Sequence, residues 1–232
     1  RGRTSPGLAD FWLFNSPFII YQLNIFPCAP YAQCRYAQYK VQNNMPHNED
    51  GHVMIKTIEQ ACQFVKKVKV CTIFSSDKVE HTSLWEHVDL PEKQPGEKGW
   101  GKKMTTVWSW KNQLTALYPN EIFYGKINGG FAVLMDMDYM ANDHFPRAYK
   151  DIQTQDSLAQ HIYSKVVTEP WDTTSLRKVT MQEVGCTKSQ FDTALKNLQV
   201  TMNIARLNDP QIERDRWVSF KEMHLNAWKQ CV

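Results

Sequence analysis

Residues 171–220 read WDTTSLRKVTMQEVGCTKSQFDTALKNLQVTMNIARLNDPQIERDRWVSF, and the predicted fold follows from this stretch. Asp172 and Thr173 are good N-cap residues for a first helix, and Gly185 tolerates the positive φ that a turn between two helices needs. A second helix is predicted over residues 187–200, and strands are predicted at 200–207 and 216–220. This order is typical of a winged helix-turn-helix, whose second helix often contacts the DNA major groove.

The predicted second helix has two contrasting faces. Phe191, Ala194, Leu195 and Leu198 follow the i, i+3, i+4, i+7 spacing of a buried stripe. The opposite face offers polar side chains to a partner, and these are Ser189, Gln190, Asp192, Thr193, Lys196 and Asn197. We expect that partner to be double-stranded DNA.

The strand-loop-strand segment carries positive charge suited to phosphate contact, at Arg206, Arg214 and Arg216. Acidic residues oppose that field, and they are Asp192, Asp209, Glu213 and Asp215. Because phosphate neutralisation normally needs clustered Lys and Arg, a protein-interaction module or a pure scaffold is the alternative interpretation.

The amino-acid composition limits the classes of protein that are possible but does not identify one. The chain has 232 residues, 42% hydrophobic and 22% charged, as in ordinary globular proteins of one large or two small domains. The formal net charge of +3 is too small to establish a nucleic-acid partner alone. The six cysteines form no CxxC motif, so buried reduced thiols, a cytoplasmic setting and no metal or cofactor are expected.

The first 53 residues differ from the rest and allow four interpretations. A signal peptide would use Arg1 and Arg3 before an apolar stretch, but Pro17 and its neighbours interrupt that stretch. A membrane span fails for the same reason, so no membrane partner is expected. We favour translation from upstream of the true start, with Met54, or alternatively Met45, as the first residue, over an ordered extension.

From Met54 onward the pattern predicts an α+β protein. A helix should begin at the capping box of Thr57 and Gln60, and strands are predicted at 70–74, 122–126 and 131–135, the last two joined at Asn128-Gly129-Gly130. Further helices are predicted after Ser83, over 106–117, from a Ser157 and Gln160 capping box, and over 221–228. A polar connector at 146–155 divides the chain into an N-terminal part, 54–150, packed against a winged-helix domain, 151–232.

Two further groups of residues are candidates for function. The loop at 91–103 places Lys98, Lys102 and Lys103 around Trp100, which suits a nucleic-acid backbone and a stacked base, or simply a solvated loop. Carboxylates at Asp136, Asp138 and Asp143 could serve a metal or acid-base site, although Asp is also common where strands end.

Taken in order, several segments resemble the AlkZ-related family, short bacterial relatives of the AlkZ-type winged-helix DNA glycosylases. The segments are IKTIEQACQFV (55–65), SLWEHV (83–88), VWSWKNQL (107–114), IFYGK (122–126), LRKV (176–179) and FDTALKNLQ (191–199). The resemblance implies winged helices with a small β element that bind DNA. The full glycosylases excise alkylated or crosslinked bases, and a Gln-hydrophobic-Gln motif positions the attacking water.

This chain departs from the family at that motif. Its Gln-x-Gln is Gln153-Thr154-Gln155, whose middle residue is not apolar and which lies in the connector. The family's catalytic residues are therefore not carried over, and a DNA-binding protein without catalysis is the first hypothesis. The alternatives are an active DNA glycosylase that uses Asp136, Asp138 or Gln113, and a non-enzymatic protein-interaction module.

Overall fold

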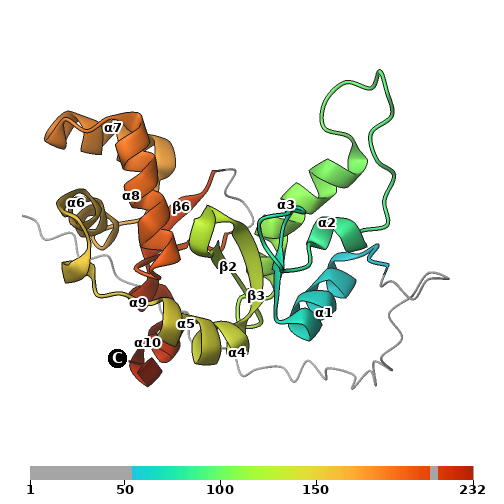
Figure 1. Cartoon of the computed structure of the whole chain (residues 1–232), viewed down its shortest axis with the longest axis horizontal. Coiled ribbons are helices and arrows are strands. Elements are labelled where there is room, and N and C mark those ends of the chain that lie inside the picture. The colour runs from blue at the N-terminus through green and yellow to red at the C-terminus, as the bar shows by residue number, and fades with distance from the viewer. Residues whose placement is uncertain (1–53, 210–213, 232) are drawn as a thin grey trace, which may run out of the picture. The chain divides into compact units, whose positions relative to one another are not determined.

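The structure is a computed structural model that describes residues 54–209 and 214–231. The interpretations of residues 1–53, and the wing residues Pro210 and Glu213, lie outside these residues. The described part is a mixed α+β fold with two small antiparallel sheets, which confirms the predicted fold class at that level (Figure 1).

The first sheet belongs to the N-terminal part of the chain. Its strands are β1 (Val70–Thr72), β2 (Ile122–Lys126) and β3 (Ala132–Asp136), in the order β1-β3-β2. The predicted hairpin is confirmed, with Tyr124 opposite Leu134 in the ladder. The accompanying helices are α1 (Ile58–Val68), α2 (Leu84–His87) and α3 (Lys102–Leu117).

Local sequence explains where these helices begin. The Thr57 hydroxyl accepts from the Gln60 backbone N–H and the Gln60 side chain accepts from Thr57 N–H, so the predicted capping box is confirmed. A second box joins Ser83 and Glu86 at α2. The helix predicted over 106–117 begins earlier, at Lys102, so Lys102 and Lys103 are helical rather than part of the loop.

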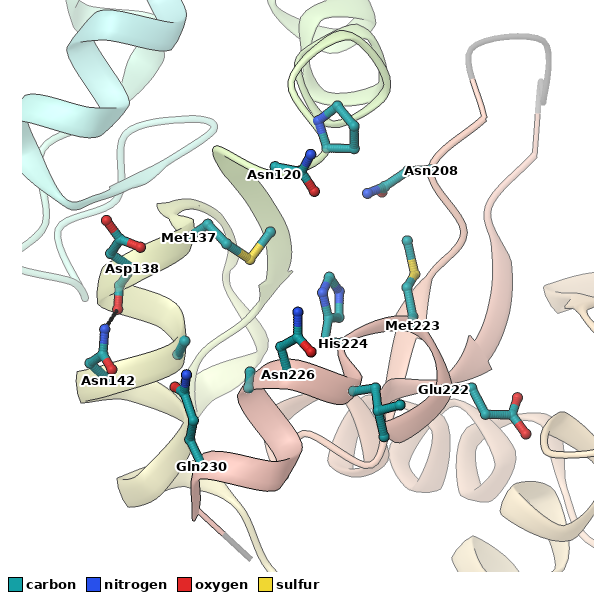
Figure 2. A pocket seen from close by; sticks show the side chains of 14 residues that line it. Asn120, Met137, Asp138, Asn142, Asn208, Glu222, Met223, His224, Asn226 and Gln230 are labelled. Atoms are coloured by element: carbon teal, nitrogen blue, oxygen red, sulfur yellow. Dashed lines mark hydrogen bonds between the residues drawn. The ribbon is translucent and has the colours of Figure 1, made fainter. Parts of the chain in front are cut away.

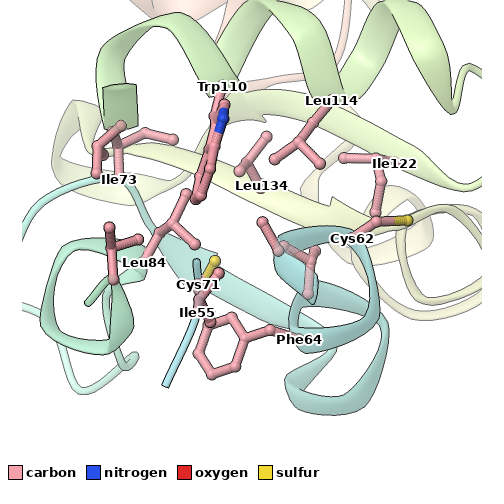
Figure 3. Packing of buried hydrophobic residues seen from close by; sticks show 14 of the residues in the cluster. Ile55, Cys62, Phe64, Cys71, Ile73, Leu84, Trp110, Leu114, Ile122 and Leu134 are labelled. Carbon is pink, nitrogen blue, oxygen red and sulfur yellow. The ribbon is translucent and has the colours of Figure 1, made fainter. Parts of the chain in front are cut away.

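The core of this part lies between α1, α3 and the sheet. Phe64, Leu114 and Leu134 are almost completely buried there, and Figure 3 shows their side chains converging with Trp110 and Ile122. Cys62 and Cys71 are buried in the same core as free thiols, as predicted, and burial raises the pKa of each to about 12. Neither thiol is a nucleophile at neutral pH.

The connector predicted at 146–155 differs from the structure at its start, because residues 146–148 belong to a helix. Residues 137–148 form a helical segment, composed of α4 (Met137–Tyr139), a π-helical turn (Met140–His144) and α5 (Phe145–Ala148). Pro146 misled the prediction, but a proline is tolerated in the first turn of a helix, where no N–H donor is needed. Phe145 is fully buried and stacks on Phe220 at 4.8 Å.

The C-terminal part is built around three longer helices and the second sheet, with two short helices at its end. The longer helices are α6 (Ser157–Val166), α7 (Thr173–Val184) and α8 (Lys188–Val200), and the strands are β4 (Trp171–Asp172), β5 (Ile204–Arg206) and β6 (Arg216–Ser219), in the order β4-β6-β5. Phe191, Ala194, Leu195 and Leu198 are all buried against α6 and β5, as predicted.

Several boundaries in this part differ from the prediction. α6 is capped by Asp156, which accepts from Ala159 N–H at 2.8 Å, rather than by a Ser157 box. The strand predicted at 200–207 is shorter because α8 continues to Val200. The closing helix predicted over 221–228 is broken at His224 into α9 (Phe220–Met223) and α10 (Leu225–Cys231).

Two leucines on α3 test this packing. Leu114 is completely buried, whereas Leu117 is 59% exposed on the same helix. We expect Leu114→Ala to lower the free energy of unfolding by about 2 to 5 kcal/mol, because it leaves a cavity in the core. Leu117→Ala should change it by less than about 0.5 kcal/mol. Urea denaturation measures both, and equal losses would contradict the described orientation of α3.

Candidate nucleic-acid interface

The turn between α7 and α8 orients α8. Gly185 ends α7 in the left-handed conformation, with φ 68°. Thr187 then caps α8 through a capping box with Gln190, whose side-chain oxygen accepts from Thr187 N–H at 2.8 Å. The oxygen of the Gln190 amide is therefore used within the helix terminus.

The outward face of α8 is open along its first half only. Ser189, Gln190 and Thr193 are exposed, whereas Lys196 and Asn197 are half-buried. α8 lies against β2 and the hairpin turn, and a Cβ added at Gly130 would meet the Lys196 side chain at 2.7 Å. A hollow of about 510 Å³ on this face is lined by Lys188, Ser189, Asp192, Thr193 and Lys196.

The acidic residue on this face is paired. Arg177 of α7 donates to Asp192 Oδ1 from Nη2 at 2.9 Å and from Nε at 3.2 Å. The guanidinium also lies 5.5 Å from the Phe191 ring centroid. This pair ties α7 to α8 and offsets the carboxylate that would otherwise repel a phosphate.

Two of the predicted arginines lie together at the base of the wing, the segment between β5 and β6. Arg214 is exposed and Arg216 is half-buried, and both line a hollow of about 590 Å³ beside Asp172 and Ser175. Arg216 Nη2 donates to the Pro170 carbonyl at 2.9 Å. This hollow is separate from the one on α8.

Arg206 does not join them, which corrects its assignment as a phosphate contact. It is 5% exposed, and Nη2 donates to the Lys111 carbonyl and to Thr115 Oγ1, each at 2.8 Å. Nη1 bonds Asn112 Oδ1, and the guanidinium lies 4.1 Å from the Tyr124 ring centroid. These contacts hold β5 against α3 and leave Arg206 no exposed surface for DNA.

Lys111 and Asp215 complete this buried cluster. Lys111 Nζ donates to Asp215 Oδ1 at 3.1 Å, and Arg206 Nη1 lies 3.5 Å from the same oxygen. Burial lowers the pKa of Lys111 and of Arg206, while the Asp215 charge acts in the opposite direction. Burial, together with Asp215, raises the pKa of Tyr124 to about 12. Two cations thus share one carboxylate, and the sequence had suggested only that Asp215 would oppose DNA binding.

The predicted DNA-binding residues of the loop before α3 differ in their exposure to solvent. Lys98, Trp100 and Lys102 are exposed. Lys103 is instead 8% exposed, donates to Glu92 Oε1 at 3.1 Å and lies 4.6 Å from the Trp85 ring centroid. Its ammonium is therefore occupied inside the fold, which corrects its place among the DNA-binding candidates.

The predicted catalytic candidates are not gathered at one pocket. Asp136 is buried, accepts from Tyr139 N–H and pairs with Lys69 at 3.2 Å. Asp138 is exposed and lines a pocket of about 680 Å³, to which neither Asp136 nor Gln113 contributes. Gln113 is exposed on α3, and Asp143 is exposed in the π-helical turn.

That pocket is lined by side-chain amides and thioethers. Figure 2 shows Asn208 and Met223 facing Met137 across the space, with His224 and Asn226 between them. Burial lowers the pKa of His224 to about 4, so the imidazole is neutral at pH 7. The lining also includes the carboxylates of Asp138 and Glu222 and no lysine or arginine, so it suits hydrogen-bond donors.

The described residues contain neither a metal-binding cluster nor a membrane-spanning helix. Within residues 54–209 and 214–231, no group of three His, Cys, Asp or Glu side chains is arranged to hold a metal ion. Over the same residues, no helix has both the length and the apolar character needed to cross a bilayer.

A family model described as AlkZ related matches residues 55–211, which is more than half of the chain. The chain belongs to the AlkZ-related family. Comparison with curated proteins gave no match, and comparison with solved structures gave none either. The region matched in this AlkZ-related chain runs from the bridge at Ile55 through α8 and β5 into the wing.

Sequence reasoning missed three residues of this AlkZ-related chain. Lys188 lies in the α8 hollow, and its exposed position in the first turn could have been predicted. Arg177 and Lys111 lacked such a signal because their carboxylate partners lie 15 and 104 residues away.

Gln153 and Gln155 lie at a short 3₁₀ turn (Ile152–Thr154), where both carbonyls accept from the Gln160 amide.

Removing the Arg206 side chain should affect stability. Arg206→Ala leaves the buried Lys111 carbonyl and the Thr115 hydroxyl without their donor and opens a cavity beside Tyr124, so we expect the free energy of unfolding to fall by about 2 to 5 kcal/mol. Arg214→Ala, at an exposed position, should stay within about 0.5 kcal/mol of the unmodified chain. Thermal and urea denaturation measure both. An Arg206→Ala protein that is stable but binds duplex DNA more weakly would show that Arg206 contacts DNA after all.

His224 predicts a dependence of stability on pH. Its folded pKa of about 4 lies below the ordinary histidine pKa of 6.5, so on acidification the unfolded chain binds a proton first. Stability should therefore decrease as pH falls from about 6.5 towards 4, with a contribution from His224 on the order of 2 kcal/mol at about pH 5.

His224→Phe should reduce that loss, because phenylalanine keeps the ring contacts with Phe123 and Phe220 without a titrating nitrogen. His81→Phe, at an exposed position, is the matched control and should keep the unmodified pH dependence. Melting temperatures at about pH 7 and pH 5 measure the difference. Equal decreases in melting temperature for the unmodified chain, His224→Phe and His81→Phe would show that His224 is not responsible.

Proposed function

We propose that the C-terminal part of this AlkZ-related protein is a winged helix-turn-helix that binds double-stranded DNA without cleaving it. In this proposal α7 and α8 are the two helices of the motif, and the segment between β5 and β6 is the wing. The observation that carries the proposal is the open, polar first half of α8, where Asp192 is paired with Arg177 and Lys188 is exposed.

The distribution of charge supports DNA binding at this surface. The formal net charge is only +3, but the acids near the surface are matched by cations inside the protein. Asp192 is paired with Arg177, and Asp215 is paired with Lys111 and Arg206. Outward-facing Lys188 and Arg214 are then available to phosphates, which supply most of the affinity of nonspecific DNA binding.

The position of the hairpin restricts where DNA would lie. Because Lys196 lies across the turn at Gly130, we infer that the duplex meets the N-terminal half of α8 rather than its whole length. Ser189, Gln190 and Thr193 are then the side chains nearest to base edges or phosphates. Lys196 and Asn197 would contribute at the margin of the contact.

Binding without base excision is favoured because the predicted catalytic candidates are not assembled at one pocket, as extruding a base and activating a water would require. Asp136 is a buried helix cap and Gln113 is exposed on α3, whereas Asp138 lines a pocket with Glu222 and without either of them. A relation to DNA repair is supported by the family. A cytoplasmic location stays a prediction.

Duplex binding tests this proposal. Anisotropy of a labelled mixed-sequence duplex should report binding that weakens as salt rises from about 50 to 200 mM. Lys188→Ala should weaken it and reduce the salt slope by about 0.9 if one phosphate contact is lost. Thr193→Glu should weaken it further by adding charge to the open face.

The control for charge is Lys67→Ala, which removes an exposed lysine from α1 and should leave duplex affinity unchanged within about twofold. No duplex affinity for the unmodified chain at low salt would overturn the proposal. Equal losses for Lys188→Ala and Lys67→Ala would overturn the assignment to α8.

A further inference from the structure

Two tryptophans beside the loop before α3 are unusually exposed. Trp100 is 60% exposed and Trp108 is 43% exposed, and their rings meet edge to face at 5.8 Å. Phe74 stacks against Trp108 at 6.2 Å and contacts Trp85 at 5.9 Å. We call Trp100, Trp108 and the supporting Phe74 the aromatic platform. Adjacent exposed indoles are rare on a protein surface unless they contact something.

The backbone holds Trp100 in this place. Gly101 has φ +76°, and a Cβ there would lie 2.7 Å from the Lys93 Cβ, so the two arms of the loop meet at this glycine. α3 begins directly afterwards at Lys102 and carries Trp108 into contact with Trp100. Figure 1 shows this loop as the long green segment between α2 and α3.

The charge around the platform is mainly positive. Glu92 is paired with Lys103, and Glu97 accepts from the Gln94 backbone N–H at 3.0 Å. Over the described ranges 54–209 and 214–231, the exposed lysines of this loop form no ion pair, and they are Lys93, Lys98 and Lys102. The loop therefore offers ammonium groups beside indole faces.

From this combination we propose that the aromatic platform binds the unpaired bases of single-stranded DNA. Indole faces stack on any exposed base, and the lysines follow the phosphates. Bases within an intact duplex are stacked on one another and are unavailable to Trp100 or Trp108. An apolar protein partner would fit less well, because it would bury the unpaired lysines.

The platform lies next to the base of the wing. Lys111 Nζ is 4.4 Å from the Trp108 ring centroid and 3.1 Å from Asp215 Oδ1, so one ammonium touches both. A strand that leaves a duplex at the wing would meet the platform. The inference extends the proposed duplex function and is carried by different residues, so each can fail alone.

The test measures the anisotropy of labelled oligodeoxythymidine and of a mixed-sequence duplex with the full chain. The double variant Trp100→Ala with Trp108→Ala should lose about tenfold or more in single-strand affinity. Its duplex affinity should change by less than about threefold. Trp100→Phe with Trp108→Phe retains aromatic rings and should keep single-strand affinity within about threefold.

Leu117→Ala removes another exposed apolar side chain from α3 and should leave single-strand affinity unchanged. If the double variant is poorly folded by circular dichroism, Trp100→Ala alone decides, since Trp100 lies in the loop, and it should lose about fivefold or more.

Three results would overturn the inference. The unmodified chain could fail to bind the single strand at low salt, the alanine variants could bind it as tightly as the unmodified chain, or they could lose duplex and single-strand affinity equally. Lost duplex binding in Lys188→Ala with intact single-strand binding would support separate sites. An unmodified chain that binds the single strand but no duplex would overturn the proposed function and leave this inference standing.

Discussion

The contact between Arg206 and α3 is the constraint on which both candidate surfaces depend. One guanidinium bonds a helix carbonyl, a helix hydroxyl and Asn112, and it covers the Tyr124 ring. β5 of the second sheet is thereby fixed to α3 of the N-terminal part. Asp215, shared by Arg206 and Lys111, brings the start of β6 to the same place. The wing and the aromatic platform are neighbours because this buried cluster holds them so.

The same cluster illustrates how the protein arranges its charges. Asp215 is partly buried and has two cations, Lys111 and Arg206. Arg177 is paired with Asp192 in the same way, and Lys103 is paired with Glu92. Each pair removes one charge of each sign, and the exposed cations outside these pairs include Lys188 on α8 and Lys93, Lys98 and Lys102 of the loop. The uneven distribution of charge, rather than its total, is what favours a nucleic-acid partner.

The sequence was sufficient where structure is decided locally. The stripe of α8, the Thr57 cap and the hairpin all follow from spacings of a few residues. It was insufficient where the deciding partner is distant. Arg206 seemed a wing cation because its partners on α3 lie 91 to 95 residues away. The prediction for Lys103 was wrong for a similar reason, since only the fold brings Glu92 to its ammonium. At Ser157 the error was different, because the adjacent Asp156 was an equally good cap and was the one used.

The two proposed surfaces suggest how a chain related to AlkZ would recognise DNA without cleaving it. A helix that meets the duplex and a platform that stacks unpaired bases would together distinguish distorted DNA from regular DNA, because only distorted DNA supplies both partners. Such recognition requires no general acid or base. The energy for discrimination would come from the exposed indoles, whose stacking is gained only when a base has already left the helix. The loop at Gly101 and the Lys111 contact with Trp108 then matter as much as α8, since they place those indoles beside the wing.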